Sequence, residues 1–162
     1  MVVDDQSTDE TENVLSKLKG IRVLRNNTNL GFLESCNYAA NNAKGEFLVF
    51  LNNDTVVVPG WLEWLLKTFE IYPDAGLVGS KLIYPNGTQQ EAGSIIWRDG
   101  SASNYGRGED PDKPEYNYLR EVDYCAGASI MIPRNLFMVL GMFDRRFAPA
   151  YYEDVDLAFK VR

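Results

Sequence analysis

Three short clusters of acidic and amide side chains each follow an apolar or aromatic run directly. They are Asp4-Asp5, Asn52-Asn53-Asp54 and Glu153-Asp154. The oxygen atoms of the second cluster suit Mg²⁺ or Mn²⁺, which take one or two carboxylates and fill their other positions with water and phosphate oxygens. One carboxylate alone makes a weak metal site, so a diphosphate would have to complete it. A carboxylate of the third cluster could act as a general base towards a hydroxyl.

Each cluster also has a purely structural interpretation. An aspartate that follows a strand often caps the next turn or helix, and for Asp4 and Asp5 this interpretation and a functional one are equally open. Glu153, Asp154 and Asp156 stand at an expected helix start, where the helix macrodipole stabilises carboxylates. Asp156 could replace Asp154 as a base if the helix began one residue differently.

The composition excludes several classes of function. The chain of 162 residues has a net charge of −7, so a broad surface for nucleic acid is not expected. It contains no histidine, which excludes a serine–histidine triad, a histidine zinc site and a histidine base. Cys36 and Cys125 form no CxxC motif, and we expect both to be reduced core residues, as in the cytoplasm. No stretch of about 18 apolar residues is present to span a membrane.

The elements that must position the clusters alternate between strands and helices. Phe47–Leu51 is a continuous apolar run, which is typical of a strand covered on both faces. The spacing of Ser7 and Glu10 matches a capping box and predicts a helix to about Lys19. Further strands are expected at 2–3 and 21–24, and further helices at 32–43, 59–69 and from about Asp154. This alternation favours a doubly wound α/β domain with a mostly parallel sheet and helices on both faces.

The pattern changes from Leu77 onwards. We expect a strand at 77–84, a turn at 85–87 and a partner strand at 94–97. Residues 99–121 are rich in Gly, Asp, Pro and Tyr without periodicity, which predicts a long surface loop. A strand at 125–132 and a helix at 133–140 complete the domain.

A phosphorelay receiver domain shares some of these features. It also begins with apolar residues and paired acids, and its acceptor aspartate ends a third strand, as Asp5 and Asp54 would. It needs a Thr or Ser and then a Lys at the ends of two later strands, whereas Ser80 and Lys81 are adjacent and too early. This interpretation also leaves the third acidic cluster without a role, so we do not favour it.

Four stretches of the sequence resemble the successive motifs of family 2 glycosyltransferases, which have the GT-A fold. They are VVDDQSTDET, NNTNLGFLESCN, KGEFLVFLNNDTVVVPGWLEWLL and YYEDVDLAFKVR. The resemblance runs over residues 2–162 in the family's order. It implies an inverting enzyme that moves a sugar from a nucleotide-diphosphate donor to a hydroxyl of a saccharide or lipid-linked acceptor. The resemblance is to a polysaccharide-building, rhamnosyltransferase-like branch.

The resemblance also implies roles for individual residues. Asp5, with Asp4 beside it, matches the acid that contacts the donor base. Asn52, Asn53 and Asp54 occupy the family's DxD position at the donor diphosphate. Asp54 is thus the implied ligand of a divalent cation, Mg²⁺ or Mn²⁺, and Asn52 is a second candidate ligand.

The acid of the family's Glu-Asp motif matches Asp154, which is the implied catalytic base, with Glu153 as its neighbour. Asp154 would take the proton of an acceptor hydroxyl that attacks the anomeric carbon from the face opposite the leaving diphosphate. The resemblance divides a single domain, 1–162, into a nucleotide-binding half at 1–76 and an acceptor-binding half at 77–162. The 99–121 loop would shape the acceptor site.

The sequence departs from the family in three places. Asn-Asn-Asp replaces the acidic DxD motif, Gln6 replaces a glycine, and the family's first strand and helix are missing before Val2. We therefore expect a fragment with an exposed sheet edge, which favours oligomers, and with little activity alone. A catalytically inactive nucleotide-sugar or glycan-binding module is the alternative function. The expected location is cytoplasmic, and peripheral at the inner membrane face for a lipid-linked acceptor.

Overall fold

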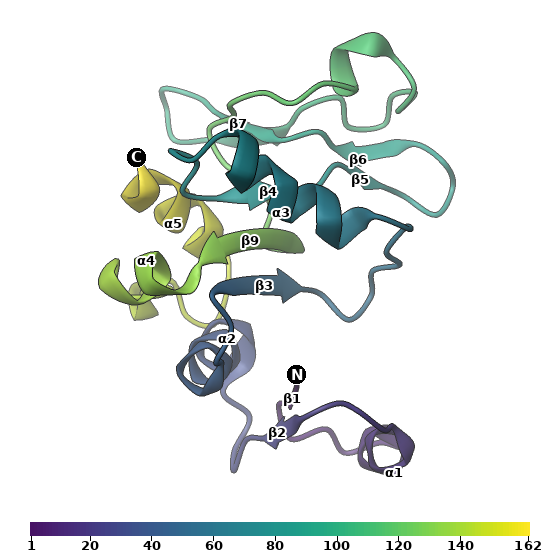
Figure 1. Cartoon of the computed structure of the whole chain (residues 1–162), viewed down its shortest axis with the longest axis vertical. Helices are drawn as coiled ribbons and strands as arrows, with labels where there is room; N and C mark the ends of the chain where they lie inside the picture. The colour runs from purple at the N-terminus through teal and green to yellow at the C-terminus, as the bar shows by residue number, and fades with distance from the viewer.

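The computed structural model describes residues 1–162. Strands alternate with helices in its first half, and short antiparallel strands follow (Figure 1). The strands are β1 (Val2–Asp4), β2 (Val23–Arg25), β3 (Phe47–Leu51), β4 (Val78–Gly79), β5 (Leu82–Ile83), β6 (Gln89–Glu91), β7 (Ser94–Ile96), β8 (Ala102–Asn104) and β9 (Ser129–Pro133). The helices are α1 (Thr11–Lys17), α2 (Gly31–Asn42), α3 (Trp61–Ile71), α4 (Arg134–Val139) and α5 (Glu153–Val161), with 3₁₀ turns at Pro114–Tyr116 and Arg145–Phe147.

The central sheet has the strand order β3-β9-β4, and β9 is antiparallel to both of its neighbours. The α/β class is confirmed, but the prediction of a mostly parallel sheet is wrong for these strands. The reason lies in the path of the chain. After β4 the chain leaves the sheet at the carboxyl ends of β3 and β4, and it re-enters at Ser129, which pairs with Leu51 at the end of β3. A strand that enters from that end must run in the opposite direction.

Helices cover both faces of this sheet, as the sequence predicts. Leu48 and Phe50 point to the face on which α2, α4 and α5 pack. Phe47 and Val49 point to the opposite face, where Phe69 of α3 lies with its ring centroid 4.9 Å from that of Phe47. This alternation surrounds β3 with apolar side chains on both faces and accounts for its continuously apolar sequence.

The β1–β2 pair is parallel and is not hydrogen-bonded to the central sheet. Figure 1 shows this pair with α1 at one end of the molecule, and α2 lies between the pair and the central sheet. No residue of α1 is buried, and the apolar side chains of Val14 and Leu18 are 53% and 51% exposed. One edge of β1 and one edge of β3 therefore have no strand partner. Unpaired edges favour association, so an oligomer remains a prediction.

The predicted capping box before α1 is wrong. The Ser7 amide donates to Asp4 Oδ1 at 2.9 Å, and the Ser7 side chain caps no helix. Asp9 Oδ1 instead accepts from the Thr11 amide at 3.0 Å, and α1 begins there. Ser7 is bonded to the end of the strand before it, so the spacing to Glu10 has no structural effect.

Every helix of the chain is too short or too polar to span a membrane.

The second half contains more strands than its sequence pattern predicts. The expected strand at 77–84 is split between β4 and β5, which belong to different sheets. The predicted loop at 99–121 contains β8, which pairs with β7, and a 3₁₀ turn. The sequence of β6 is Gln-Gln-Glu and that of β8 is Ala-Ser-Asn, so neither shows an apolar alternation. Gln89 and Glu91 are nevertheless 0% and 1% exposed, so polar side chains occupy interior positions in this strand.

Candidate active site

The Asn52-Asn53-Asp54 cluster lies in a turn at the carboxyl end of β3. The Thr55 amide and hydroxyl both donate to the Asn52 carbonyl, at 3.3 and 2.7 Å, and close the turn. Asn53 and Asp54 are exposed, and the Asp54 carboxylate has no hydrogen-bond or ion-pair partner in the chain. The backbone thus forms the turn and leaves the side-chain oxygens free to bind a ligand.

This set of oxygen atoms fits a divalent cation only as part of a larger site. The chain assembles no group of three His, Cys, Asp or Glu side chains that could hold a metal ion. One carboxylate and two amide oxygens are hard ligands of the kind that Mg²⁺ and Mn²⁺ prefer, and phosphate oxygens and water would complete the coordination. Asp54, with Asn52 beside it, therefore fits a cation that is shared with a diphosphate.

Asp154 is the second residue of α5 and lies beside the turn that precedes β9. The Gly127 amide donates to Asp154 Oδ2 at 3.0 Å. The next residue, Ala128, accepts from the Asn52 amide at 2.9 Å through its carbonyl. Two neighbouring residues of one turn thus contact the second and third acidic clusters, and the structure brings these clusters together.

The entry into α5 has an unusual backbone. Tyr151 and Tyr152 both have positive φ, at 84° and 68°, and Tyr152 is the N-cap of the helix. Each left-handed residue other than glycine costs about 1–2 kcal/mol, and such residues gather at functional sites. The Tyr152 hydroxyl donates to the Gly100 carbonyl at 3.2 Å, which joins this entry to the β7–β8 hairpin. The strained turn sets where α5 starts and so where Asp154 lies.

The two acids next to Asp154 have different surroundings. Glu153 is only 6% exposed, its Oε2 has no hydrogen-bond partner, and burial raises its pKa. Burial raises the pKa of the Cys36 thiol to about 12, and the negative charge of Glu153 acts in the same direction. Asp156 forms an ion pair with Lys160 at 2.7 Å. Among these acids, only Asp154 is bonded to the turn that precedes β9.

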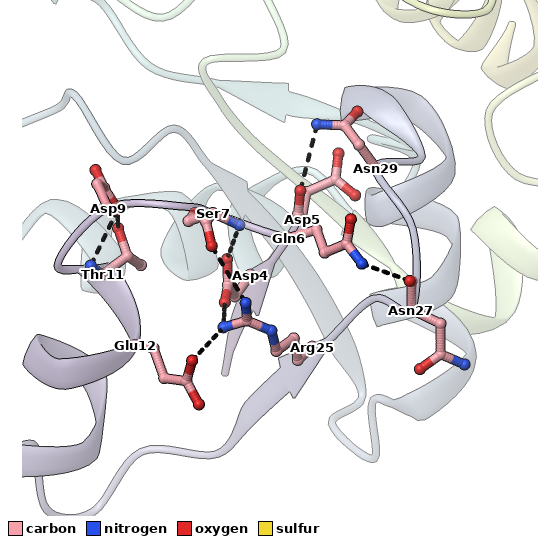
Figure 2. Close-up of polar contacts among 10 residues, drawn as sticks. All are labelled: Asp4, Asp5, Gln6, Ser7, Asp9, Thr11, Glu12, Arg25, Asn27 and Asn29. Atoms are coloured by element: carbon pink, nitrogen blue, oxygen red, sulfur yellow. Dashed lines mark hydrogen bonds and ion pairs between the residues drawn. The ribbon is translucent and has the colours of Figure 1, made fainter.

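Asp4 is buried in an internal network (Figure 2). Its Oδ1 accepts from the Ser7 amide at 2.9 Å, and its Oδ2 forms an ion pair with Arg25 at 2.7 Å. Arg25 also reaches Glu12, at 3.1 Å. The bonds from Ser7, with the charge of Arg25, lower the pKa of Asp4. These contacts hold β1, β2 and the segment before α1 together.

Asp5 is bonded to the start of α2. Its Oδ1 accepts from Asn26 Nδ2 at 2.7 Å and from the Leu30 amide at 2.8 Å, and its Oδ2 accepts from the Gly31 amide at 2.8 Å. Burial raises the pKa of Asp5, but these hydrogen bonds together outweigh it, so the pKa lies below its ordinary value. Asp5 thus has a capping role, and its contact with a donor base stays a prediction.

Glu91 lies in the same neighbourhood, although no sequence pattern marks it as a site residue. This fully buried carboxylate accepts from the Ala126 amide at 2.9 Å, one residue before the amide that bonds Asp154. Glu91 stands in a strand without apolar residues, so no hydrophobic pattern marks it as an interior position. From sequence alone, a glutamate in a short polar strand is normally assigned to the surface.

The fold is shared with solved glycosyltransferases of the GT-A class. A structure of GalNAc-T7 with UDP, GalNAc and Mn²⁺ superimposes with a TM-score of 0.70 at 17% identity, over 99% of this chain and 34% of that one. The mannosyltransferase PcManGT of Pyrobaculum calidifontis, solved with GDP-mannose and Mn²⁺, gives a TM-score of 0.66 at 20% identity, over 99% of this chain and 41% of that one. The expected GT-A fold is therefore confirmed.

The sequence defines the family within this class. The model of glycosyl transferase family 2 matches residues 1–137, so the chain belongs to that family. It is 36% identical to the O-antigen biosynthesis protein RfbC of Myxococcus xanthus, over 77% of this chain and 10% of that protein. It is 30% identical to the uncharacterized protein y4gI of Sinorhizobium fredii, over 100% of this chain and 19% of that protein. The chain thus spans between 10% and 19% of the length of these relatives.

Proposed function

We propose that this chain transfers a sugar, with inversion, from a nucleotide-diphosphate donor to a hydroxyl of a saccharide or lipid-linked acceptor in cell-surface polysaccharide synthesis. The observation that carries the proposal is the turn that joins Asp154 to the backbone of the Asn52-Asn53-Asp54 cluster, in which Asn53 and Asp54 are exposed. The family and the likeness to an O-antigen biosynthesis protein support it. A lipid-linked acceptor would place the reaction at the inner face of the cytoplasmic membrane.

Residues at the ends of β1 and β3 would bind the donor. Asp54 and Asn52 would hold a divalent cation, and both structural neighbours were solved with Mn²⁺, which supports this choice. When bound, such a cation supplies positive charge that stabilises the leaving diphosphate. A carboxylate has about four lone-pair positions, and Asp5 uses three within the chain, so about one is left for a donor base.

Asp154 would act on the acceptor. Backbone amides bond both of its oxygens, Gly127 at 3.0 Å and Val155 at 2.8 Å, and so fix the orientation of the carboxylate. The carboxylate takes the proton as the acceptor oxygen forms its bond to the anomeric carbon and the bond to the diphosphate breaks. Glu153 would support Asp154 from the interior, since its own side chain is buried. The β7–β8 hairpin and the exposed Tyr151 border the acceptor side.

Product analysis tests the proposal directly. The protein is incubated with UDP- and dTDP-sugars, Mn²⁺ and saccharide or lipid-linked acceptors, and the anomeric configuration of the product is read by NMR. A product with inverted configuration is the expected result, and a retained configuration would overturn the proposed mechanism. Nucleotide binding without any product, both by the 162-residue chain and by a longer protein that includes it, would instead support the inactive binding module.

A further inference from the structure

Glu91 is a buried carboxylate with an arranged set of partners. Its side chain is 1% exposed on β6, which pairs only with β5. Its Oε1 accepts from the Ala126 amide at 2.9 Å, and its Oε2 accepts from Asn104 Nδ2 at 3.0 Å. Burial raises the pKa of Glu91, and the charge of Asp154 acts in the same direction. A buried carboxylate is costly to retain, so its partners must compensate.

The partners of Glu91 lead to the candidate site. Ala126 donates its amide to Glu91, and the next residue, Gly127, donates its amide to Asp154. The carbonyl of the third residue, Ala128, accepts from the Asn52 amide. These three consecutive residues, which we name the 126–128 turn, therefore contact Glu91, the expected base and the end of β3.

We propose that Glu91 is a positioning residue that sets the orientation of the 126–128 turn and through it the orientation of the Asp154 carboxylate. The peptide planes that carry the Ala126 and Gly127 amides meet at the Cα atom of Ala126, so a rotation of the first amide is passed to the second where φ and ψ of Ala126 do not absorb it. Glu91 makes no hydrogen bond to Asp154 or to the cluster after β3, so its geometric effect passes through the turn. Its charge also acts on Asp154 through space, and Glu91→Gln, which removes the charge but keeps an acceptor for Ala126, separates the two effects. The role for the reaction depends on the proposed function of Asp154 as the base.

A matched residue separates positioning from ordinary stability. Gln89 lies two positions earlier on the same strand and is 0% exposed. Its Nε2 donates to the Tyr105 carbonyl at 3.0 Å, and it makes no hydrogen bond to the 126–128 turn. Gln89→Ala and Glu91→Ala both remove a buried polar side chain from β6. Only the second removes a bond to Ala126.

The kinetic test compares three variants in the transfer assay. Because a misplacement of about 1 Å can cost about 10²-fold in rate, Glu91→Ala should lower kcat about 10- to 100-fold with an almost unchanged KM for the donor. Glu91→Gln keeps an oxygen that can accept from Ala126 and should restore kcat to within about threefold of the wild type. Gln89→Ala should keep the wild-type kcat. An equal loss of kcat in Gln89→Ala, or no loss in Glu91→Ala, would overturn the proposal.

A second readout needs no activity. In ¹H–¹⁵N NMR spectra, Asp154→Ala identifies the shift of the Gly127 amide that accompanies loss of its acceptor. Glu91→Ala should move the Gly127 amide although it does not touch that residue, and Gln89→Ala should not. An unmoved Gly127 amide in Glu91→Ala contradicts the inference. If Glu91→Ala does not fold, Glu91→Asp replaces it, since its shorter side chain keeps the charge but cannot reach Ala126.

The two readouts separate this inference from the proposed function. A Gly127 response, with no transfer either by the 162-residue chain or by a longer protein that includes it, would refute the proposed function and leave the coupling between Glu91 and the turn in place. Transfer by the wild type without a Gly127 response in Glu91→Ala would refute the coupling between Glu91 and the turn and leave the proposed function in place.

Discussion

The Gly127 amide donates to Asp154 Oδ2 at 3.0 Å, and this bond joins the start of α5 to the turn that leads into β9. The contact relates residues that lie 27 positions apart in the chain. On the other side of the same turn, the Ala128 carbonyl holds the end of β3 through the Asn52 amide at 2.9 Å. The relative positions of the expected base and the expected metal ligand therefore depend on one short segment of backbone.

Asp154→Asn should abolish transfer while it spares binding of the donor nucleotide. The amide side chain keeps the shape of aspartate but cannot take a proton, and a general base contributes about 10²–10⁴-fold to rate. Asp156→Asn is the matched control, because Asp156 stands on the same helix in an ion pair with Lys160. Turnover and calorimetric nucleotide affinity are measured for both variants. Unaltered turnover of Asp154→Asn would remove Asp154 from the mechanism.

Gln6→Gly should stabilise the protein. Gln6 has a φ of 62°, a conformation that costs a side chain about 1–2 kcal/mol and glycine almost nothing. The change also removes the bond from Gln6 Nε2 to the Asn27 carbonyl, and glycine adds conformational freedom to the unfolded chain at a cost of about 0.5–1 kcal/mol, so the expected net gain in the free energy of unfolding is small, at most about 1 kcal/mol. Urea unfolding measures it. Thr8→Gly, at an exposed position without positive φ, should lower stability, and an equal loss in Gln6→Gly would contradict the expectation.

Stability should be greatest at weakly acidic pH. Burial raises the pKa of Glu91 and Glu153 in the folded protein. As the pH falls, these two carboxylates therefore bind protons at a higher pH in the folded state than in the unfolded state. The free energy of unfolding should therefore fall as the pH rises through these raised pKa values. Hydrogen bonds lower the pKa of Asp4 and Asp5, so their contribution is lost as the pH falls below about 3.9, the ordinary aspartate value.

Urea unfolding between about pH 4 and pH 8 measures this profile around the ordinary glutamate pKa. The double variant Glu91→Gln and Glu153→Gln should flatten the decline towards neutral pH, since its buried amides do not titrate. A decline of the same slope in the double variant would assign it to other groups.

The sequence predicts the parts of the fold that depend on apolar periodicity. The continuous run of β3 and the alternation of strands with helices indicated a sheet between two helix layers, and the core is built in that way. The direction of β9 could not be predicted, because an apolar strand looks the same in a parallel and an antiparallel ladder. Only the path of the chain through β5 to β8 decides it.

The site was predictable where side chains of the right type follow a strand and unpredictable where burial decides the role. The Asn52–Asp54 cluster and Asp154 were found because they end apolar or aromatic runs. The structural interpretation of Asp4 also agrees with its contacts to Ser7 and Arg25. Glu91 was missed because its strand is polar, and its burial depends on tertiary packing around β6.

The most direct test of the central claim is a calorimetric titration of UDP and dTDP into the protein, with Mn²⁺ and then with EDTA. If Asp54 holds a cation against the donor diphosphate, one nucleotide binds with Mn²⁺, EDTA abolishes binding, and Asp54→Ala weakens it at least about tenfold, whereas Asp74→Ala at an exposed site after α3 does not. Nucleotide binding that is equally tight in EDTA and in Asp54→Ala would contradict the account.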